Sequence, residues 1–241
     1  MTDAGKGREG MTRYALYFAP ESDNAWWHAG NQWLGRDADA ARDLPQPPLD
    51  GIQPDVQHQL TQDARRYGFH ATLKAPFHLA SGYTEAALHL ALEEFCQQLA
   101  PVTGLAPSVQ WMGNFLALRP TKNQTAINEL AFACVQQFDR FRAPMSAADL
   151  ARRQQHPLNA RQQALLMQWG YPYTQEEFRF HMTLTDRLEQ GPLADHFHAA
   201  AQAYFDLDTP LDINSIALFT EPRPGADFQL SARFPFGRYA A

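Results

Sequence analysis

The sequence has few cysteines, no long apolar run and no excess of positive charge, and each shortage argues against a class of protein. Only two cysteines occur among the 241 residues, Cys96 and Cys134, both within apolar helical patterns. We expect free thiols in a reducing cytoplasm rather than a disulfide scaffold. No apolar run reaches the roughly 20 residues of a membrane-spanning helix. The formal net charge of −6 argues against a protein that follows a long nucleic-acid backbone.

Several familiar motifs are also missing. The sequence has no glycine-rich phosphate loop, no dinucleotide-binding fingerprint and no Gly-x-Ser-x-Gly nucleophile elbow. His196 and His198 fall within a helical pattern, in which residues two apart do not share a face. Neither His70 nor His181 has a nearby cysteine or glutamate at zinc-ligand spacing. We therefore expect no cofactor and no metal.

The order of strand-like and helix-like segments predicts an α+β fold. Apolar strand patterns cover residues 13–19, 68–77, 111–119, 178–185, 213–220 and 228–235. Helical spacing of apolar residues covers 24–34, 84–100, 125–142, 160–169 and 193–204. Residues 1–12 are polar and glycine-rich, which predicts a disordered tail before a single domain over 13–241. We expect this domain to consist of two lobes that are interleaved in the sequence and face each other across a groove.

One pentapeptide pattern occurs twice. Phe-His-Ala-Thr-Leu at 69–73 recurs as Phe-His-Met-Thr-Leu at 180–184. Side chains two apart share one face of a strand, so His70 and Thr72 point one way, as do His181 and Thr183. The remaining motif positions are apolar and predict a face packed against helices. The repetition favours a catalytic role for both histidines over a structural one.

Four further residues are candidates for substrate binding. If the motif strands extend in both directions, Arg66 and Lys74 share the face of the first histidine, and Arg179 shares that of the second. Tyr14 or Tyr17, from the opening strand, would line the groove, and we assign Tyr14. Instead of binding substrate, each of these three cations could be a solvated surface charge or an ion-pair partner.

The residue types in the two motifs suit phosphoryl chemistry. The unperturbed imidazole pKa is near 6.5, so one histidine can accept a proton while the other donates one. Threonine hydroxyls can donate to phosphoryl oxygens whose charge grows in the transition state. Opening a cyclic phosphodiester needs such a base, an acid and donors, and no metal in principle.

The flanking residues extend the pattern to a resemblance. The relevant stretches are Arg-Tyr-Ala-Leu-Tyr-Phe-Ala-Pro at 13–20, Arg-Tyr-Gly-Phe-His-Ala-Thr-Leu-Lys-Ala-Pro-Phe at 66–77, Trp-Gly-Tyr-Pro-Tyr at 169–173 and Phe-Arg-Phe-His-Met-Thr-Leu-Thr at 178–185. With these, the chain resembles the 2H phosphoesterase superfamily, and within it the DUF1045 branch of phosphonate-metabolism proteins. The resemblance implies two pseudo-duplicated antiparallel sheets with outer helices around a central groove. It also implies that His70 and His181 are the acid/base pair and that Thr72 and Thr183 anchor the phosphate.

The expected function is a metal-independent cyclic phosphodiesterase. Its substrate would be a small cyclic phosphate, either a nucleoside 2′,3′-cyclic or a ribosyl 1,2-cyclic phosphate, the latter suggested by the branch name. An RNA-end 2′-5′ phosphodiesterase or ligase is one alternative, and a non-catalytic module that binds a phosphorylated nucleotide or sugar is another. We expect no membrane partner and favour a monomer.

Overall fold

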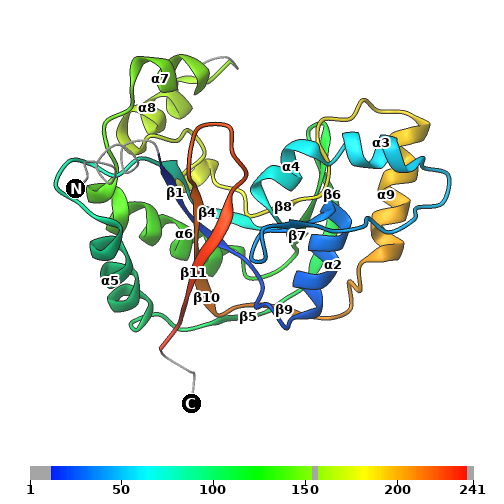
Figure 1. The fold of residues 1–241 in the computed structure, drawn as a ribbon, viewed down its shortest axis with the longest axis horizontal. Coiled ribbons are helices and arrows are strands. Elements are labelled where there is room, and N and C mark those ends of the chain that lie inside the picture. Colours follow the sequence, from blue (N-terminus) through cyan, green and yellow to red (C-terminus); the bar gives the residue numbers. More distant parts are fainter. Residues whose placement is uncertain (1–11, 154–156, 238–241) are drawn as a thin grey trace, which may run out of the picture.

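In the computed structural model, which describes residues 12–153 and 157–237, the central element is an antiparallel sheet of seven strands (Figure 1). The strand order is β11-β10-β1-β4-β8-β7-β6. These strands are β1 (Arg13–Phe18), β4 (Ala71–Phe77), β6 (Pro107–Met112), β7 (Phe115–Pro120), β8 (Met182–Thr183), β10 (Ser215–Glu221) and β11 (Gln229–Pro235). Two small antiparallel pairs are β2 (Arg36–Asp37) with β3 (Arg42–Asp43), and β5 (Val102–Leu105) with β9 (Leu211–Ile213).

Helices accompany both halves of the sheet. They are α2 (Ala25–Leu34), α3 (Pro54–Gln59), α4 (Gln62–Tyr67), α5 (Glu85–Cys96), α6 (Gln124–Phe138), α7 (Ala147–Arg153), α8 (Ala160–Trp169) and α9 (Pro192–Tyr204), with 3-10 turns η1 (Asp139–Phe141) and η2 (Gln175–Glu177). Helix α5 contacts β10 and β11, α6 contacts β4, and α9 contacts β6 at the other end (Figure 1). None of the helices in the described part of the chain combines the length and apolar character needed to cross a membrane.

The predicted α+β class and the antiparallel sheets are confirmed. The two sheets are the halves β11-β10-β1-β4 and β8-β7-β6, and they join into one because β4 pairs with β8 at Ala71 and Met182. Five predicted helices are present as α2, α5, α6, α8 and α9. The expected tail lies outside the described residues except for Thr12, so the domain boundaries stay a prediction.

Both motif strands are shorter than the sequence predicts. Strand β4 begins at Ala71 rather than at 68, and β8 contains only Met182 and Thr183. The carbonyls of Gly68 and Arg179 accept hydrogen bonds from the motif histidines. These two carbonyls therefore bond histidine side chains instead of a neighbouring strand. The backbone hydrogen bonds of each motif strand begin only after its histidine.

The apolar face of the two motifs belongs to the main core, as predicted. Phe69, Leu73, Phe180, Met182 and Leu184 are all buried in one cluster. That cluster also takes in apolar residues of α5, α6 and α9. Because these neighbours are apolar, the polar motif residues are left facing the other side of the sheet.

Helix α2 supports the first motif through a glycine. A Cβ added at Gly30 would lie 2.1 Å from the Cδ1 atom of Phe69, which is fully buried and immediately precedes His70. Gly30→Ala should gain about 1 kcal/mol of helix propensity, but the fixed ring leaves no room for the methyl group. We expect a net loss of about 1–3 kcal/mol in unfolding free energy. Denaturant unfolding checks this, with exposed His28→Ala on the same helix as the near-neutral control; an unchanged midpoint for Gly30→Ala would contradict it.

Candidate active site

The pairing of β4 with β8 brings the two motifs together on one face. Ala71 and Met182 are direct antiparallel partners, so Thr72 stands opposite His181 and His70 stands opposite Thr183. These four side chains are half-buried, whereas Ala71 and Met182 are buried on the opposite face. Each histidine therefore lies across from the threonine of the other motif. The predicted acid/base residues and phosphate anchors converge in this arrangement.

The two histidines are held in the same way. His70 Nδ1 lies 2.9 Å from the carbonyl oxygen of Gly68, and His181 Nδ1 lies 2.7 Å from that of Arg179. A carbonyl only accepts, so Nδ1 carries the proton and Nε2 is left with its lone pair. The Thr72 hydroxyl lies 3.4 Å from His70 Nε2. Both Nε2 atoms are thus available for proton transfer.

The surroundings favour the neutral form of both imidazoles. Burial lowers the pKa of His70 to about 4; the bond to Gly68 opposes this shift and the nearby His181 adds to it. Burial also lowers the pKa of His181, against the bond to Arg179 and with a further contribution from Arg119. A bound phosphate would raise both pKa values, because an adjacent anion favours the imidazolium.

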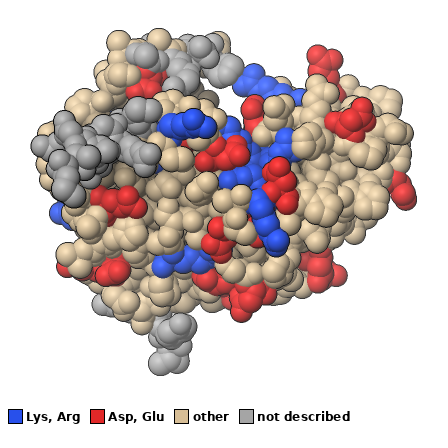
Figure 2. Space-filling model, in the orientation of Figure 1, with Lys and Arg blue, Asp and Glu red and all other residues tan. Residues whose placement is uncertain are grey.

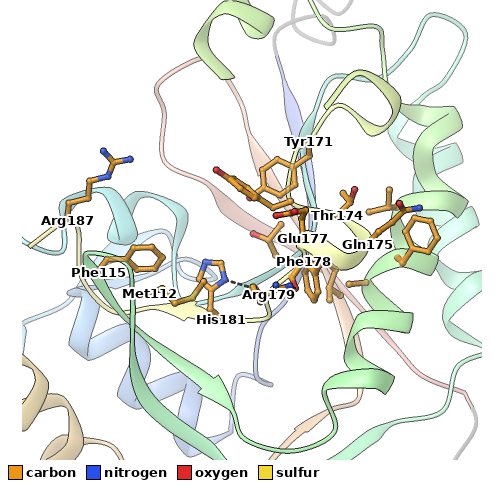
Figure 3. Close-up of a pocket in the computed structure, with 16 residues that line it drawn as sticks. Met112, Phe115, Tyr171, Thr174, Gln175, Glu177, Phe178, Arg179, His181 and Arg187 are labelled. Atoms are coloured by element: carbon orange, nitrogen blue, oxygen red, sulfur yellow. Dashed lines mark hydrogen bonds between the residues drawn. The ribbon is translucent and has the colours of Figure 1, made fainter. Parts of the chain in front are cut away.

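Two cavities meet at the motifs. One of about 510 Å³ contains Thr72 and His181, and a second of about 230 Å³ contains His70 and Thr183. Phe115 and Arg187 line both, so the cavities are neighbouring parts of one groove. In Figure 3, His181 lies between Met112 and Phe115 on one side and Phe178 and Arg179 on the other. The larger cavity is completed by Leu73, Ala131, Phe132, Val135, Tyr171, Tyr173, Thr174, Gln175 and Glu177.

Sequence reasoning chose the wrong tyrosine of β1. Tyr14 packs beside Phe77 in the main core, and its hydroxyl donates to Glu85. Tyr17 instead stacks on His70, with ring centroids 3.8 Å apart and planes 25° apart. Strand alternation places the two tyrosines on opposite faces, and the small residues flanking Tyr17, at 15 and 19, were the available signal for the groove face.

The three candidate cations have different surroundings. Arg66 lies in α4 rather than in a strand, and it donates to Glu221, to the Tyr67 hydroxyl and to a backbone carbonyl. The Lys74 ammonium is buried and donates to the Val135 carbonyl and to Asp139; burial lowers its pKa to about 8, against the influence of Asp139. Lys74 lines neither of the two groove cavities.

Arg179 is the candidate cation that lines the larger cavity. Its guanidinium donates to the carbonyls of Glu176 and Phe178, at 2.6 and 2.7 Å. The sequence missed Phe115, whose ring centroid is 5.7 Å from that of His181, and Arg187 in the loop after the second motif. Both come from segments with no motif of their own, so only the fold brings them to the groove.

Comparison with known proteins identifies relatives. Residues 72–229 match the family described as "Protein of unknown function (DUF1045)". The ribose 1,5-bisphosphate phosphokinase PhnN of Janthinobacterium sp. (strain Marseille) is 43% identical over 238 residues, which cover 95% of this chain and 51% of that protein. Its namesake in Laribacter hongkongensis (strain HLHK9) is 38% identical over 218 residues, covering 90% of this chain and 50% of that protein. The chain thus spans about half the length of the curated relatives that it matches.

Solved structures with some likeness are much more distant in sequence. The crystal structure of E. coli LigT complexed with 3′-AMP is 14% identical, with a TM-score of 0.44, over 95% of this chain and 99% of that chain. TT0787 of Thermus thermophilus is 12% identical, with a TM-score of 0.43, over 93% of this chain and 98% of that chain. At these TM-scores the likeness carries no argument about the site.

Proposed function

The chain belongs to the DUF1045 family of proteins of unknown function, and we propose from its site that it is a metal-independent cyclic phosphodiesterase. The observation that carries the proposal is the cross-pairing of the two His-x-Thr motifs on one face of the sheet. Both histidines lie on the groove with Nδ1 fixed and Nε2 available. Two matched proton-transfer groups with hydroxyls beside them suit the opening of a phosphate ring.

The proposed reaction is a hydrolysis at phosphorus. One imidazole takes a proton from water at Nε2 as the water oxygen forms a bond to phosphorus. The other, as imidazolium, gives a proton to the sugar oxygen as the bond between that oxygen and phosphorus breaks. The Thr72 and Thr183 hydroxyls donate to the two non-bridging oxygens as their charge grows. The products are a phosphate monoester and a free sugar hydroxyl, and each proton-transfer role supplies about 10²–10⁴-fold.

The names of the relatives support a ribosyl substrate. They are called ribose 1,5-bisphosphate phosphokinases, but that name belongs to proteins about twice as long, and this chain has no glycine-rich phosphate loop. If 5-phosphoribosyl 1,2-cyclic phosphate loses the bond between phosphorus and O2, the product is ribose 1,5-bisphosphate. The proposed reaction would thus supply the compound that the relatives are named for using.

A nucleotide substrate is the second candidate, because the larger cavity has aromatic walls. Phe115, Tyr171 and Phe178 line it beside His181, and aromatic rings are the usual platform for an unpaired base. A nucleoside 2′,3′-cyclic phosphate or an RNA end would use these walls, whereas a ribosyl phosphate would leave them largely unfilled.

A panel of cyclic phosphates separates these candidates. Purified protein with EDTA would be incubated with 5-phosphoribosyl 1,2-cyclic phosphate, with nucleoside 2′,3′-cyclic phosphates and with an RNA ending in a 2′,3′-cyclic phosphate, and products followed by phosphorus NMR. The proposal predicts the highest kcat/KM for the ribosyl compound and ribose 1,5-bisphosphate as its product. If a nucleoside cyclic phosphate or the RNA end is turned over faster, the substrate is a nucleotide rather than a ribosyl phosphate. If the protein binds these compounds but turns over none of them, it is a binding module.

The histidine environments predict an acidic pH optimum. The base must be neutral and the acid protonated, so the active fraction peaks between their two pKa values. Both pKa values lie below 6.5 in the free protein, so we expect kcat/KM to be highest below pH 6.5 and to fall at higher pH. Steady-state rates from about pH 4.5 to about pH 9 check this, and a maximum above about pH 7 would contradict it.

Unfolding measurements at each pH provide the control. The two groove histidines have lowered pKa values in the fold, so the unfolded chain takes up protons before the folded one as the pH falls below 6.5. His70 therefore contributes stability that is present above pH 6.5 and is lost as the pH falls through about 4. If the rate falls between pH 6.5 and about 4 in parallel with the fraction of folded protein, the loss reflects unfolding rather than protonation of the catalytic base.

A further inference from the structure

A buried glutamate holds two arginines on the groove side of the sheet. Arg13, at the start of β1, is the register partner of Glu221, at the end of β10. Glu221 has a fully buried side chain; one carboxylate oxygen accepts from Arg13 Nε and the other from Arg66. The backbone N–H of Gly225 donates to it as well, at 3.0 Å. Strand alternation places Arg13 on the same face of β1 as Tyr17, which is the face of His70.

This cluster carries more positive charge than its one carboxylate balances. The side chains of Arg13 and Arg66 are 14% and 26% exposed, so both are partly removed from water. Among the described residues, neither terminal nitrogen of Arg13 has a recorded hydrogen-bond partner, and Arg66 retains N–H groups beyond its bonds to Glu221, Tyr67 and Ala226. Figure 2 shows basic side chains running across the middle of one face of the molecule, with acidic ones between them.

Aromatic rings connect the cluster to the first motif. The Arg66 guanidinium lies over the Tyr67 ring, 5.1 Å from its centroid, and that ring is 6.3 Å from the ring of His70. Arg13 lies over Phe228, which stacks on Tyr67. Burial would lower the pKa of Arg13, but Glu221 and then Tyr67 and Tyr17 raise it overall. One aromatic ring, that of Tyr67, therefore separates the Arg66 guanidinium from His70, and two rings, those of Phe228 and Tyr67, separate the Arg13 guanidinium from it.

A purely structural ion pair needs only one of these arginines. A second half-buried cation on the same carboxylate loses hydration without gaining a full counter-charge. An anion bound against both guanidinium groups would supply that charge, and planar arginines bind phosphate with paired hydrogen bonds. The separation of Arg66 from His70 by one ring suits a group attached to the substrate away from the reacting phosphorus.

We propose that Arg13 and Arg66 form a second phosphate subsite, with Glu221 as the positioning residue, and that the substrate is a cyclic phosphate carrying a separate phosphate monoester. This inference rests on the proposed function and assigns residues to the second phosphate of its substrate. The 5-phosphate of a ribosyl 1,2-cyclic phosphate is such a group. The reacting phosphate would lie at the two motifs and the monoester at the arginines.

The test compares two substrates that differ only in the monoester. The ratio of kcat/KM for 5-phosphoribosyl 1,2-cyclic phosphate to that for ribose 1,2-cyclic phosphate should be at least about 100 in the wild type, and Arg66→Gln should lower it at least tenfold. Arg66→Lys, which keeps the charge but not the paired geometry, should give an intermediate ratio. Arg233→Gln is the matched control: Arg233 is also half-buried and paired with a carboxylate, Glu21, and should leave the ratio unchanged.

A binding measurement keeps this test separate from catalysis. Calorimetry would give the dissociation constants of ribose 1,5-bisphosphate and ribose 1-phosphate for the wild type and for Arg66→Gln. The subsite predicts at least tenfold tighter binding of the bisphosphate, lost in the variant. If no cyclic phosphate is turned over but this preference is present, the proposed function fails and the subsite stands. Equal affinities, or a ratio that Arg66→Gln leaves unchanged, would overturn the subsite.

Discussion

Replacing His70 or His181 with glutamine should lower kcat for ring opening by about 10²–10⁴-fold in each case. Glutamine has a similar length and an amide N–H that can replace the bond to the carbonyl of Gly68 or Arg179, but it cannot exchange a proton at neutral pH. The loss should appear mainly in kcat, because both roles operate in the transition state. Because acid and base serve the same step, the double variant should lose less than the product of the two single effects.

His78 offers a matched control for these variants. Its Nδ1 atom also bonds a backbone carbonyl, that of Thr12, at 2.9 Å, yet it lies outside both groove cavities. His78→Gln should retain the wild-type rate. A His70→Gln or His181→Gln variant that turns over the substrate within about threefold of the wild type would remove that histidine from the chemistry.

Replacing Thr72 or Thr183 with valine should lower kcat by about 10²-fold, a smaller loss than at the histidines. Valine keeps the branched shape and removes the hydroxyl, so the developing charge on one phosphoryl oxygen loses its donor. For Thr72 the contact with His70 Nε2, at 3.4 Å, is also lost, so its pH profile should shift whereas that of Thr183→Val should not.

Steady-state kinetics on both threonine variants measure these effects. Thr220→Val on β10 is the control, because the Thr220 hydroxyl contacts Ser231 and lies in neither groove cavity. Valine variants at 72 and 183 with unchanged kcat would show that the hydroxyls do not stabilise the transition state. A raised KM with unchanged kcat would assign them to binding alone.

The sequence identified the polar centre of the groove because two short patterns agreed. His-x-Thr repeats within apolar positions, and a two-residue period is enough to place His70 with Thr72 and His181 with Thr183. The cross-pairing of His70 with Thr183 could not be predicted, because it depends on the register of two strands far apart in the chain.

The predictions failed where a residue's role depends on its surroundings in the fold. Strand parity fails at Arg66 because the chain there is helix α4, which ends at Tyr67 and is followed by Gly68 with a φ of +79°. Parity alone also could not choose between Tyr14 and Tyr17, since it separates two faces without saying which one is the groove. Glu221 carries no local signal, although it holds both Arg13 and Arg66.

The role of the Lys74 charge also depends on the fold rather than on the local sequence. Its position on the motif strand suggested a phosphate ligand, yet its ammonium bonds the end of α6 and Asp139. The sequence correctly predicted that Lys74 lies on the motif strand. Its binding partners, however, come from α6 and the residue that follows it, which pack beside that strand.

Ring opening in ¹⁸O-labelled water tests the central claim most directly. EDTA-treated protein would be given 5-phosphoribosyl 1,2-cyclic phosphate, and the product analysed by mass spectrometry and phosphorus NMR beside the His70→Gln variant. The account predicts one labelled oxygen per ring opened, located on the phosphate at C1, at a rate that EDTA does not change and that falls sharply in the variant. An intact ring, label on a sugar carbon, or activity that EDTA abolishes and a divalent metal restores would contradict it.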